Sequence, residues 1–229
     1  MNTKKLLNKM GIVPIKELNF QEKNNLIKEF LELMLYSFYN LQLSYEQIYN
    51  KMSQCKMYIA KFDARLGNAN YIYKNNTIYF RNGIEINCKD YYILHELIHY
   101  FQDIRDENGN LKKIGICDFE EFKVRGLSLN EAAVQYIVAK MLQMPEEQIN
   151  YYGIHLKTNT KDYYPLICDL INKIIYLFGE DSLINSVLFS TDKFKLEIID
   201  YCGEEAFNNV QIYFDTIAEL QQKLRYKIQ

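Results

Sequence analysis

The pattern His95-Glu96-Leu97-Ile98-His99 contains the residues of this chain whose types and spacing best suit metal chemistry. On a helix, side chains four residues apart lie on one face, so both imidazoles can bind one zinc ion at about 2.0–2.1 Å. Glu96 is not needed as a ligand and can act as general base on a water molecule. Because the chain has only three histidines, chance explains this pattern poorly. We expect His95 and His99 to bind Zn²⁺ and Glu96 to be the catalytic residue.

The same segment has a separate apolar face. Leu94, Leu97, Ile98 and Phe101 follow the spacing i, i+3, i+4 and i+7, so a helix can bury them while the histidines face a cleft. The competing interpretation has no metal: the two histidines lie at the edge of the core, bonded to backbone carbonyls, and Glu96 is a surface charge.

A third ligand is required, because catalytic zinc generally has three protein ligands and a water molecule. The residues after His99 lack the glycine and histidine of the longer HExxHxxGxxH pattern. A downstream carboxylate is the remaining source of a ligand. The candidates are Asp118, Glu120, Glu121 and Glu131.

Glu131 is the preferred third ligand. It lies at the start of a well-patterned helix, and the two alanines that follow it leave room for close packing against the HExxH helix. However, Ser128-x-x-Glu131 also has the pattern of a capping box, in which Glu131 would only cap its own helix. The sequence leaves both roles open.

The segments HELIH and NEAAVQ together resemble the gluzincin metallopeptidases, whose HExxH helix is joined by a glutamate from a later helix. The resemblance implies a zincin-like fold, with His95, His99 and Glu131 as zinc ligands and Glu96 as general base. The stretch from Glu131 to Pro145 is also weakly similar to the ImmA/IrrE family of repressor-cleaving bacterial metallopeptidases. The resemblance covers about residues 70 to 145. Gln135 stands where gluzincins usually have an aspartate, and no helix-turn-helix motif is recognisable.

Other polar residues offer supporting roles. An oxyanion formed during peptide hydrolysis needs a stabilising donor, for which the sequence offers His155, Tyr151, Tyr152 and Arg125 without choosing among them. The alternative interpretation of His155 is an ordinary surface or interface histidine with no catalytic role. Asp103 and Asp106 follow the motif and either bond a ligand imidazole or are solvated charges at the helix end.

The order of the patterns predicts an α+β fold that is mostly helical, with a small sheet before the HExxH helix. A helical face between Phe20 and Leu41 and a cap at Ser44 indicate a helical start. Strands are expected at Met57–Phe62, Tyr71–Tyr73, Thr77–Phe80 and Ile84–Asn87, with a hairpin turn at 74–76. Asp90 is a good N-cap. Later helices are expected at 91–103, 129–143, 163–178, 181–189, 192–201 and 204–226.

Length and composition favour one domain. With 229 residues, of which 48% are hydrophobic and 24% charged, the chain can bury a large core. We expect a single zincin-like domain over 1–229, with a helical portion at 1–55, the sheet and metal-site core at 56–145, and a helical portion at 146–229.

Charge and hydropathy exclude several partners. The formal net charge is -2 and there is no basic run, so nucleic acid is not an expected partner. Apolar stretches are broken by charges, so no membrane contact is expected. Five widely spaced cysteines and the lack of a signal-like N-terminus indicate a cytoplasmic protein with reduced thiols, although a removed export signal stays possible. The oligomeric state is left open.

Together these patterns predict a zinc-dependent peptide-bond hydrolase. A strand just before the HExxH helix, within Tyr71–Phe80 or at Ile84–Asn87, is an edge to which an extended polypeptide substrate can pair, as an endopeptidase requires. The alternative is a non-catalytic, zincin-like interaction or regulatory protein whose metal site is structural or empty. The substrate and its pathway are left open.

Overall fold

The computed structural model describes residues 3–41, 43–63, 66–120, 123–160 and 164–228. Within these residues the chain forms two compact units, Met1–Asp103 and Ile104–Gln229. The fold is α+β, as the sequence predicts. The boundary between the units falls inside the region 56–145 that the sequence analysis treats as one core. Among the described helices, none is both long and apolar enough to cross a membrane.

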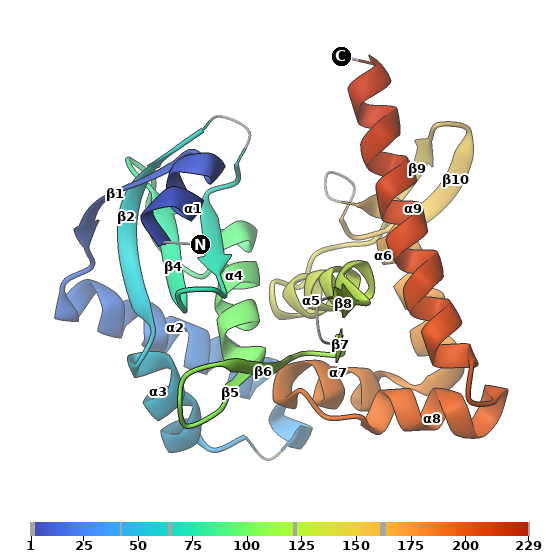
Figure 1. Cartoon of the computed structure of the whole chain (residues 1–229). Coiled ribbons are helices and arrows are strands. Elements are labelled where there is room, and N and C mark those ends of the chain that lie inside the picture. The colour runs from blue at the N-terminus through green and yellow to red at the C-terminus, as the bar shows by residue number, and fades with distance from the viewer. Residues whose placement is uncertain (1–2, 42, 64–65, 121–122, 161–163, 229) are drawn as a thin grey trace. The chain divides into compact units, whose positions relative to one another are not determined.

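The first unit contains a sheet with four described strands, in the order β1-β2-β4-β3 (Figure 1). β1 is antiparallel to β2, β2 is parallel to β4, and β3 is antiparallel to β4. Among these strands β3 therefore lies at an edge. The strands are β1 (Ile12–Glu17), β2 (Lys56–Phe62), β3 (Ala69–Ile72) and β4 (Thr77–Arg81).

The turn between β3 and β4 confirms the predicted hairpin. Asn76 has φ 54, in the left-handed region that asparagine tolerates better than most residues. The hydroxyl of Thr77 bonds the carbonyl of Asn75 at 2.9 Å, which fixes the turn further. This short connection sets the register of the edge strand, in which Tyr71 is opposite Ile78.

Helices cover the sheet of the first unit. α1 packs on it through a cluster made of Leu7, Ile12, Ala60, Ile72 and Tyr79. α4 contacts β3 and β4, and α3 packs between α2 and α4. Ser44 caps α3, as predicted, by accepting a hydrogen bond from the N–H of Gln47. The helices are α1 (Thr3–Met10), α2 (Phe20–Ser37), the 3₁₀ turn η1 (Tyr39–Leu41), α3 (Tyr45–Ser53) and α4 (Tyr91–Gln102).

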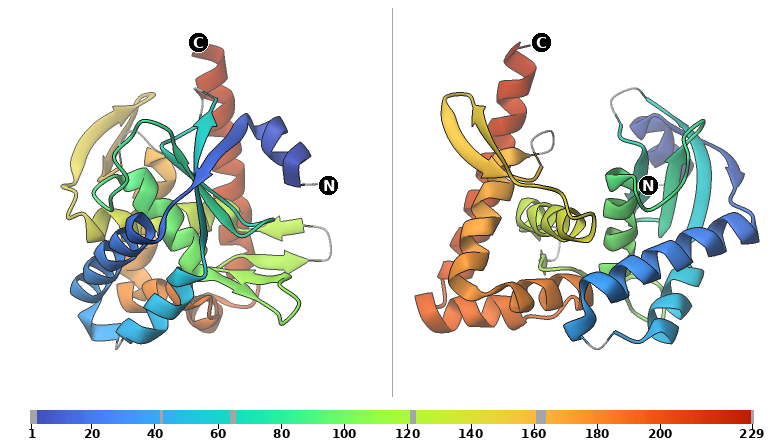
Figure 2. Two further views of the ribbon diagram at one scale, coloured as in Figure 1. Left: turned by 90° about the vertical axis from the view of Figure 1, so that its left-hand side faces the viewer. Right: turned by 180° about the vertical axis from the view of Figure 1, so that it is seen from behind.

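The second unit is built around α5, which contacts α6, α7 and α9 (Figure 2). Its helices are α5 (Leu127–Met141), α6 (Pro165–Phe178), α7 (Glu180–Phe189), α8 (Lys193–Cys202) and α9 (Ala206–Ile228). Short paired strands accompany them: β5 (Asp103–Arg105) with β6 (Leu111–Ile114), β7 (Asp118–Glu120) with β8 (Lys123–Arg125), and β9 (Glu147–Tyr151) with β10 (Ile154–Thr158).

The predicted helices from residue 91 onward agree with the described ones to within about two residues, apart from residue 163, which lies outside the described residues. The predicted strand Ile84–Asn87 is wrong: this segment has bends at both ends and no regular secondary structure between them. Gly83, with φ 87, turns the chain away from β4. The N–H of Cys88 then donates to the carboxylate of Glu29, at 3.0 Å, rather than to a strand.

Candidate metal centre

The helix that carries the HExxH motif is capped as the sequence predicts. The Asp90 side chain accepts hydrogen bonds from the N–H groups of Tyr92 and Ile93, at 2.9 and 3.3 Å. Asn68 donates to the second carboxylate oxygen of Asp90 at 2.6 Å, which holds the cap in place. These bonds satisfy donors that the first turn of a helix leaves without an intrahelical acceptor.

The predicted apolar face of α4 lies in the core. Leu94, Leu97 and Ile98 are fully buried, and Phe101 is nearly so. This face anchors the helix against the first unit. The histidines are therefore presented from a rigid element, because their backbone cannot shift without disturbing a packed core.

The two histidines of the motif converge. The Nε2 atoms of His95 and His99 lie 2.8 Å apart, and the rings meet edge-on at 73°. The histidine side chains are 5% and 7% exposed. Two ligands of a tetrahedral zinc, each about 2.0–2.1 Å from the ion, are separated by about 3.3 Å. Small side-chain rotations can increase the distance between the two Nε2 atoms by about 0.5 Å. The two histidines therefore fit two ligand positions of one zinc site.

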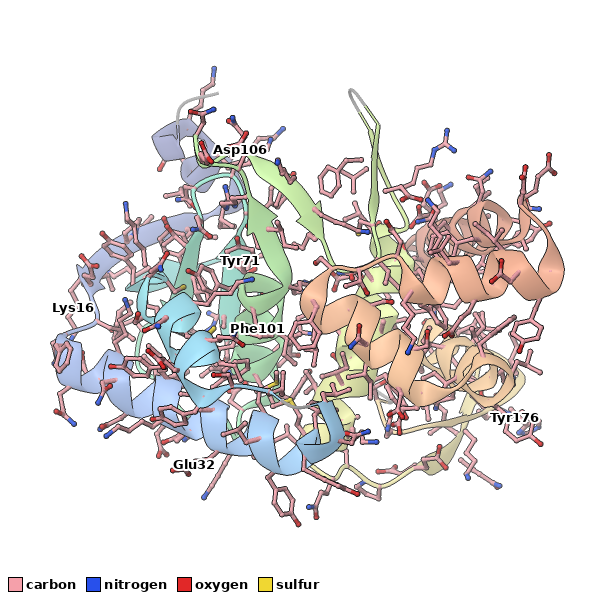
Figure 3. The ribbon with its side chains drawn as sticks, turned by 90° about the horizontal axis from the view of Figure 1, so that it is seen from below. Lys16, Glu32, Tyr71, Phe101, Asp106 and Tyr176 are labelled. Atoms are coloured by element: carbon pink, nitrogen blue, oxygen red, sulfur yellow. The ribbon has the colours of Figure 1, made fainter. Side chains whose placement is uncertain are left out.

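Glu96 is directed to the edge strand of the sheet. Its Oε2 atom accepts a hydrogen bond from the backbone N–H of Tyr71 on β3, at 2.7 Å. The position of the carboxylate is therefore fixed by a strand as well as by its own helix. Figure 3 labels Tyr71 on this strand and Phe101 near the end of α4.

The side-chain hydroxyl of Tyr71 contacts two further residues of the first unit. It lies 2.6 Å from Oδ2 of Asp103 and 2.9 Å from Oδ1 of Asn76. Asp103 is 6% exposed, so it is not a solvated charge at the helix end. Burial lowers the pKa of Lys51, while the nearby charge of Asp103 opposes that shift. Tyr71 thus connects the buried Asp103 with the carboxylate of Glu96.

Asp106, the other acid that follows the motif, has a local role. Its carboxylate accepts hydrogen bonds from the N–H groups of Asn108 and Asn110, at 2.9 and 2.8 Å, in the loop between β5 and β6. A hydrogen bond from the side-chain amide of Asn110, at 3.1 Å, contributes most to lowering the pKa of Asp106, and the two backbone bonds lower it further. Asp106 therefore serves the turn of its own loop.

A residue that the sequence analysis missed contacts His99. The Nε2 atom of Gln102 lies 2.7 Å from Nδ1 of His99, and Gln102 is completely buried. The signal that could have found it is its place three residues after His99, which puts both side chains on one helical face.

The capping-box interpretation of Glu131 is wrong. The N-cap of α5 is Gly126, and Ser128 already lies inside the helix. The carboxylate of Asp215, on α9, accepts hydrogen bonds from the N–H groups of Gly126 and Ser128, at 3.1 and 2.9 Å. A residue from a distant helix therefore caps α5, and Glu131 is left to another role.

The start of α5 is fitted closely to α9. Gly126 has φ 74, and a Cβ atom at this position would lie 2.6 Å from the side-chain nitrogen of Gln211. Gln211 is 1% exposed and donates to the carbonyl of Ile116 at 3.3 Å. Only glycine can adopt this positive φ and also leave room for the Gln211 side chain without strain. This fit sets where α5 begins and hence the position of Glu131 within the second unit.

The electrostatic surroundings of Glu131 include two buried thiols. Burial raises the pKa of Cys117, and the charges of Glu131, Asp215 and Asp118 raise it further. Burial likewise raises the pKa of Cys168 to about 12, with a smaller contribution from Glu131. In the absence of a metal ion, these cysteines therefore stay protonated thiols near neutral pH.

The other proposed carboxylates differ from Glu131. Asp118 forms an ion pair with Lys195, in which both carboxylate oxygens lie 3.0 Å from the lysine nitrogen. Glu121 lies outside the described residues, and Glu120 is described only as part of β7. His95 and His99 belong to the first unit and Glu131 to the second. Two imidazole nitrogens and a carboxylate oxygen are a donor set that can hold a zinc ion.

The oxyanion candidates all lie in the second unit. His155 is exposed on β10, opposite Asn150. Tyr151 and Tyr152 are at the turn of the same hairpin, with ring centroids 4.6 Å apart. Arg125 donates to the side-chain oxygen of Asn208 at 3.0 Å. Which of these residues stabilises an oxyanion stays an open prediction.

Comparison with known proteins gives no assignment: no family model, curated protein or solved structure matches the chain. The function is therefore inferred from the chemistry of the residues themselves.

Proposed function

We propose that this protein is a zinc-dependent peptide-bond hydrolase, a gluzincin-like endopeptidase that acts on extended polypeptides. The observation that carries the proposal is the convergence of His95 Nε2 and His99 Nε2, 2.8 Å apart, on the helix that also presents Glu96. A zincin-like fold and a relationship to the ImmA/IrrE family are part of the same proposal. They are supported by a sheet whose edge strand precedes the HExxH helix.

Glu131 is the proposed third ligand. Two neutral imidazoles and one carboxylate are a common donor set of catalytic zinc, which keeps its fourth position for water or substrate. The proposal is supported by the position of Glu131, inside α5 and away from the cap that Asp215 provides. It is also supported by the engagement of Asp118 with Lys195.

Zinc bound at this site supplies Lewis acidity, which polarises the scissile carbonyl and makes a water molecule more acidic. Glu96 accepts a proton from the attacking water and delivers it to the leaving amine. His95 and His99 hold their positions through the buried face of α4. The Tyr71 N–H donates to Oε2 of Glu96 and so helps to orient the carboxylate that handles the proton.

The substrate class follows from the edge strand. β3 pairs with β4 on one side and lies at the edge among the described strands of its sheet. An extended polypeptide can add to such an edge through main-chain hydrogen bonds, which are independent of side-chain identity. Because Glu96 bonds β3 itself, a chain that pairs with β3 is brought to the general base.

A cytoplasmic location is proposed together with this function. The five cysteines are all unpaired by disulfides, and four of them are buried. Reduced, buried thiols are typical of proteins in reducing compartments.

A second candidate is favoured by one contact. Glu96 accepts a backbone hydrogen bond, as a purely structural carboxylate also does. In that case the protein is a non-catalytic, zincin-like interaction or regulatory protein. Its metal site is then structural or empty, and the protein hydrolyses no peptide bond.

The experiment that separates the two candidates is digestion of an unstructured peptide library by the zinc-loaded protein, read by mass spectrometry. The hydrolase proposal expects cleavage by the wild type, loss of at least about 100-fold in Glu96→Gln, and retention of zinc in that variant. Glu32→Gln is the matched control, because Glu32 is an exposed glutamate of the same unit (Figure 3). Equal cleavage by wild type and Glu96→Gln would contradict the mechanism, and zinc binding without cleavage would favour the second candidate.

A further inference from the structure

His99 is contacted at both of its ring nitrogens. Nε2 lies 2.8 Å from Nε2 of His95, and Nδ1 lies 2.7 Å from Nε2 of Gln102. Gln102 is the last residue of α4 and is completely buried. An amide at this distance in a buried site forms a hydrogen bond whose direction determines where His99 carries its proton.

A neutral imidazole has one N–H. If His99 binds a metal through Nε2, its hydrogen must be on Nδ1, and Nδ1–H then needs an acceptor. If the hydrogen is on Nε2 instead, Nδ1 needs a donor, and Nε2–H donates to Nε2 of His95. The partner of Nδ1 must therefore be a hydrogen-bond acceptor in the first tautomer and a donor in the second.

We propose that Gln102 is a positioning residue that holds His99 in its metal-binding tautomer by accepting a hydrogen bond from Nδ1–H. The inference rests on the proposed zinc site and names a residue that the HExxH pattern does not include. A rotation of about 180° about the last side-chain bond exchanges the amide oxygen and nitrogen of glutamine at nearly unchanged positions. The carbonyl oxygen can therefore take the place, 2.7 Å from Nδ1, where the amide nitrogen lies.

The residue type suits this task. Glutamine can accept from Nδ1–H in one tautomer and donate to Nδ1 in the other, so the hydrogen bond to His99 can form in both. A carboxylate would accept only, and it would add a charge to a completely buried position. The amide therefore orients the ligand without burying a further negative charge next to Asp103.

Two substitutions distinguish this role from simple core packing. Gln102→Met keeps the length and volume of the side chain but cannot accept a hydrogen bond. Gln102→Glu keeps the acceptor and removes the donor. A packing role predicts that the methionine variant binds zinc like the wild type, whereas a positioning role predicts that the glutamate variant does so and the methionine variant does not.

The measurement is zinc affinity, by competition with a chromophoric chelator, together with the absorption spectrum of the cobalt-substituted protein. We expect Gln102→Met to bind zinc about 10- to 100-fold more weakly, with an altered cobalt spectrum. We expect Gln102→Glu to bind at least as tightly as the wild type. Gln221→Met is the matched control, since Gln221 is a buried glutamine of α9, and its zinc affinity should not change.

The outcomes separate the two proposals. If the wild type binds zinc and Gln102→Met binds it equally well, the role of Gln102 is refuted while the zinc site stands. Weaker binding by Gln102→Glu, about 10-fold or more, also refutes it, and this variant serves where the methionine protein does not fold. If the wild type and His95→Ala with His99→Ala retain zinc equally, the metal site itself fails, and the role of Gln102 fails with it.

Discussion

The carboxylate of Glu96 accepts a hydrogen bond from the backbone N–H of Tyr71, at 2.7 Å, so the proposed general base is joined to the edge strand of the sheet. The hydroxyl of the same tyrosine lies 2.6 Å from the buried Asp103. The backbone N–H and the side-chain hydroxyl of Tyr71 therefore both help to fix the position of β3 relative to α4. In the proposed mechanism, this arrangement relates substrate pairing at β3 to proton transfer at Glu96.

Extended peptides should be better substrates than short ones. A longer chain can pair along β3, whereas a single amino-acid amide makes almost none of these main-chain contacts. We expect kcat/KM to rise at least about 10-fold between dipeptide amides and peptides of about eight residues. Initial rates on a length series with one scissile bond measure this, and a preference for amino-acid amides would indicate an aminopeptidase-like site.

The role of Glu131 can be tested by Glu131→Gln, which keeps the size of the side chain and removes its charge. If Glu131 is the third ligand, zinc affinity should fall at least about 10-fold, while melting in the presence of a chelator stays near that of the wild type. Glu219→Gln is a control, because Glu219 is an exposed glutamate on α9. Unchanged zinc affinity in Glu131→Gln would transfer the search to Asp118, Glu120 and Glu121.

Asp215 should stabilise the second unit by capping α5. Asp215→Ala removes the acceptor of two backbone N–H groups at the helix start. We expect the free energy of unfolding to fall by about 1–2 kcal/mol, the usual cost of a lost cap. Urea denaturation measures it, with Asp200→Ala, at an exposed position of α8, as the control. A loss equal to that of the control would mean that Asp215 does not cap α5.

The cysteines should differ sharply in reactivity. Burial raises the pKa of Cys55, Cys88, Cys117 and Cys168, so near pH 8 almost none of each is thiolate, and reactivity should appear only well above that pH. Cys202 is exposed. A thiol reagent at pH 8 should label Cys202 rapidly in the native protein and the other four only after unfolding. Rapid labelling of two or more thiols in the native protein would contradict the described burial.

The helix that carries the motif could be predicted because its signals are local. The apolar spacing of Leu94, Leu97 and Ile98 and the cap at Asp90 lie within one short segment, and all were confirmed. The convergence of His95 and His99 follows from the same periodicity. Helix position and ligand direction are therefore properties that a single sequence can specify.

Contacts between distant segments could not be predicted in this way. Ser128 and Glu131 have the local pattern of a cap, but Asp215, which follows 87 residues after Ser128, provides the cap instead. The sequence analysis predicted no strand at β1, which contains Pro14 and lies at an edge of the sheet, where proline is tolerated. The bond between Glu96 and Tyr71 depends on the sheet register, which no motif reveals.

The central claim is that His95 and His99 hold one zinc ion. The most direct measurement is the zinc content of protein purified without chelator, by inductively coupled plasma mass spectrometry. The wild type and His155→Ala, which changes an exposed histidine of the second unit, should each hold about one zinc per chain. The double variant His95→Ala with His99→Ala should hold almost none. A double variant that keeps the full zinc content, or a wild type that binds none even when zinc is supplied, would contradict the account.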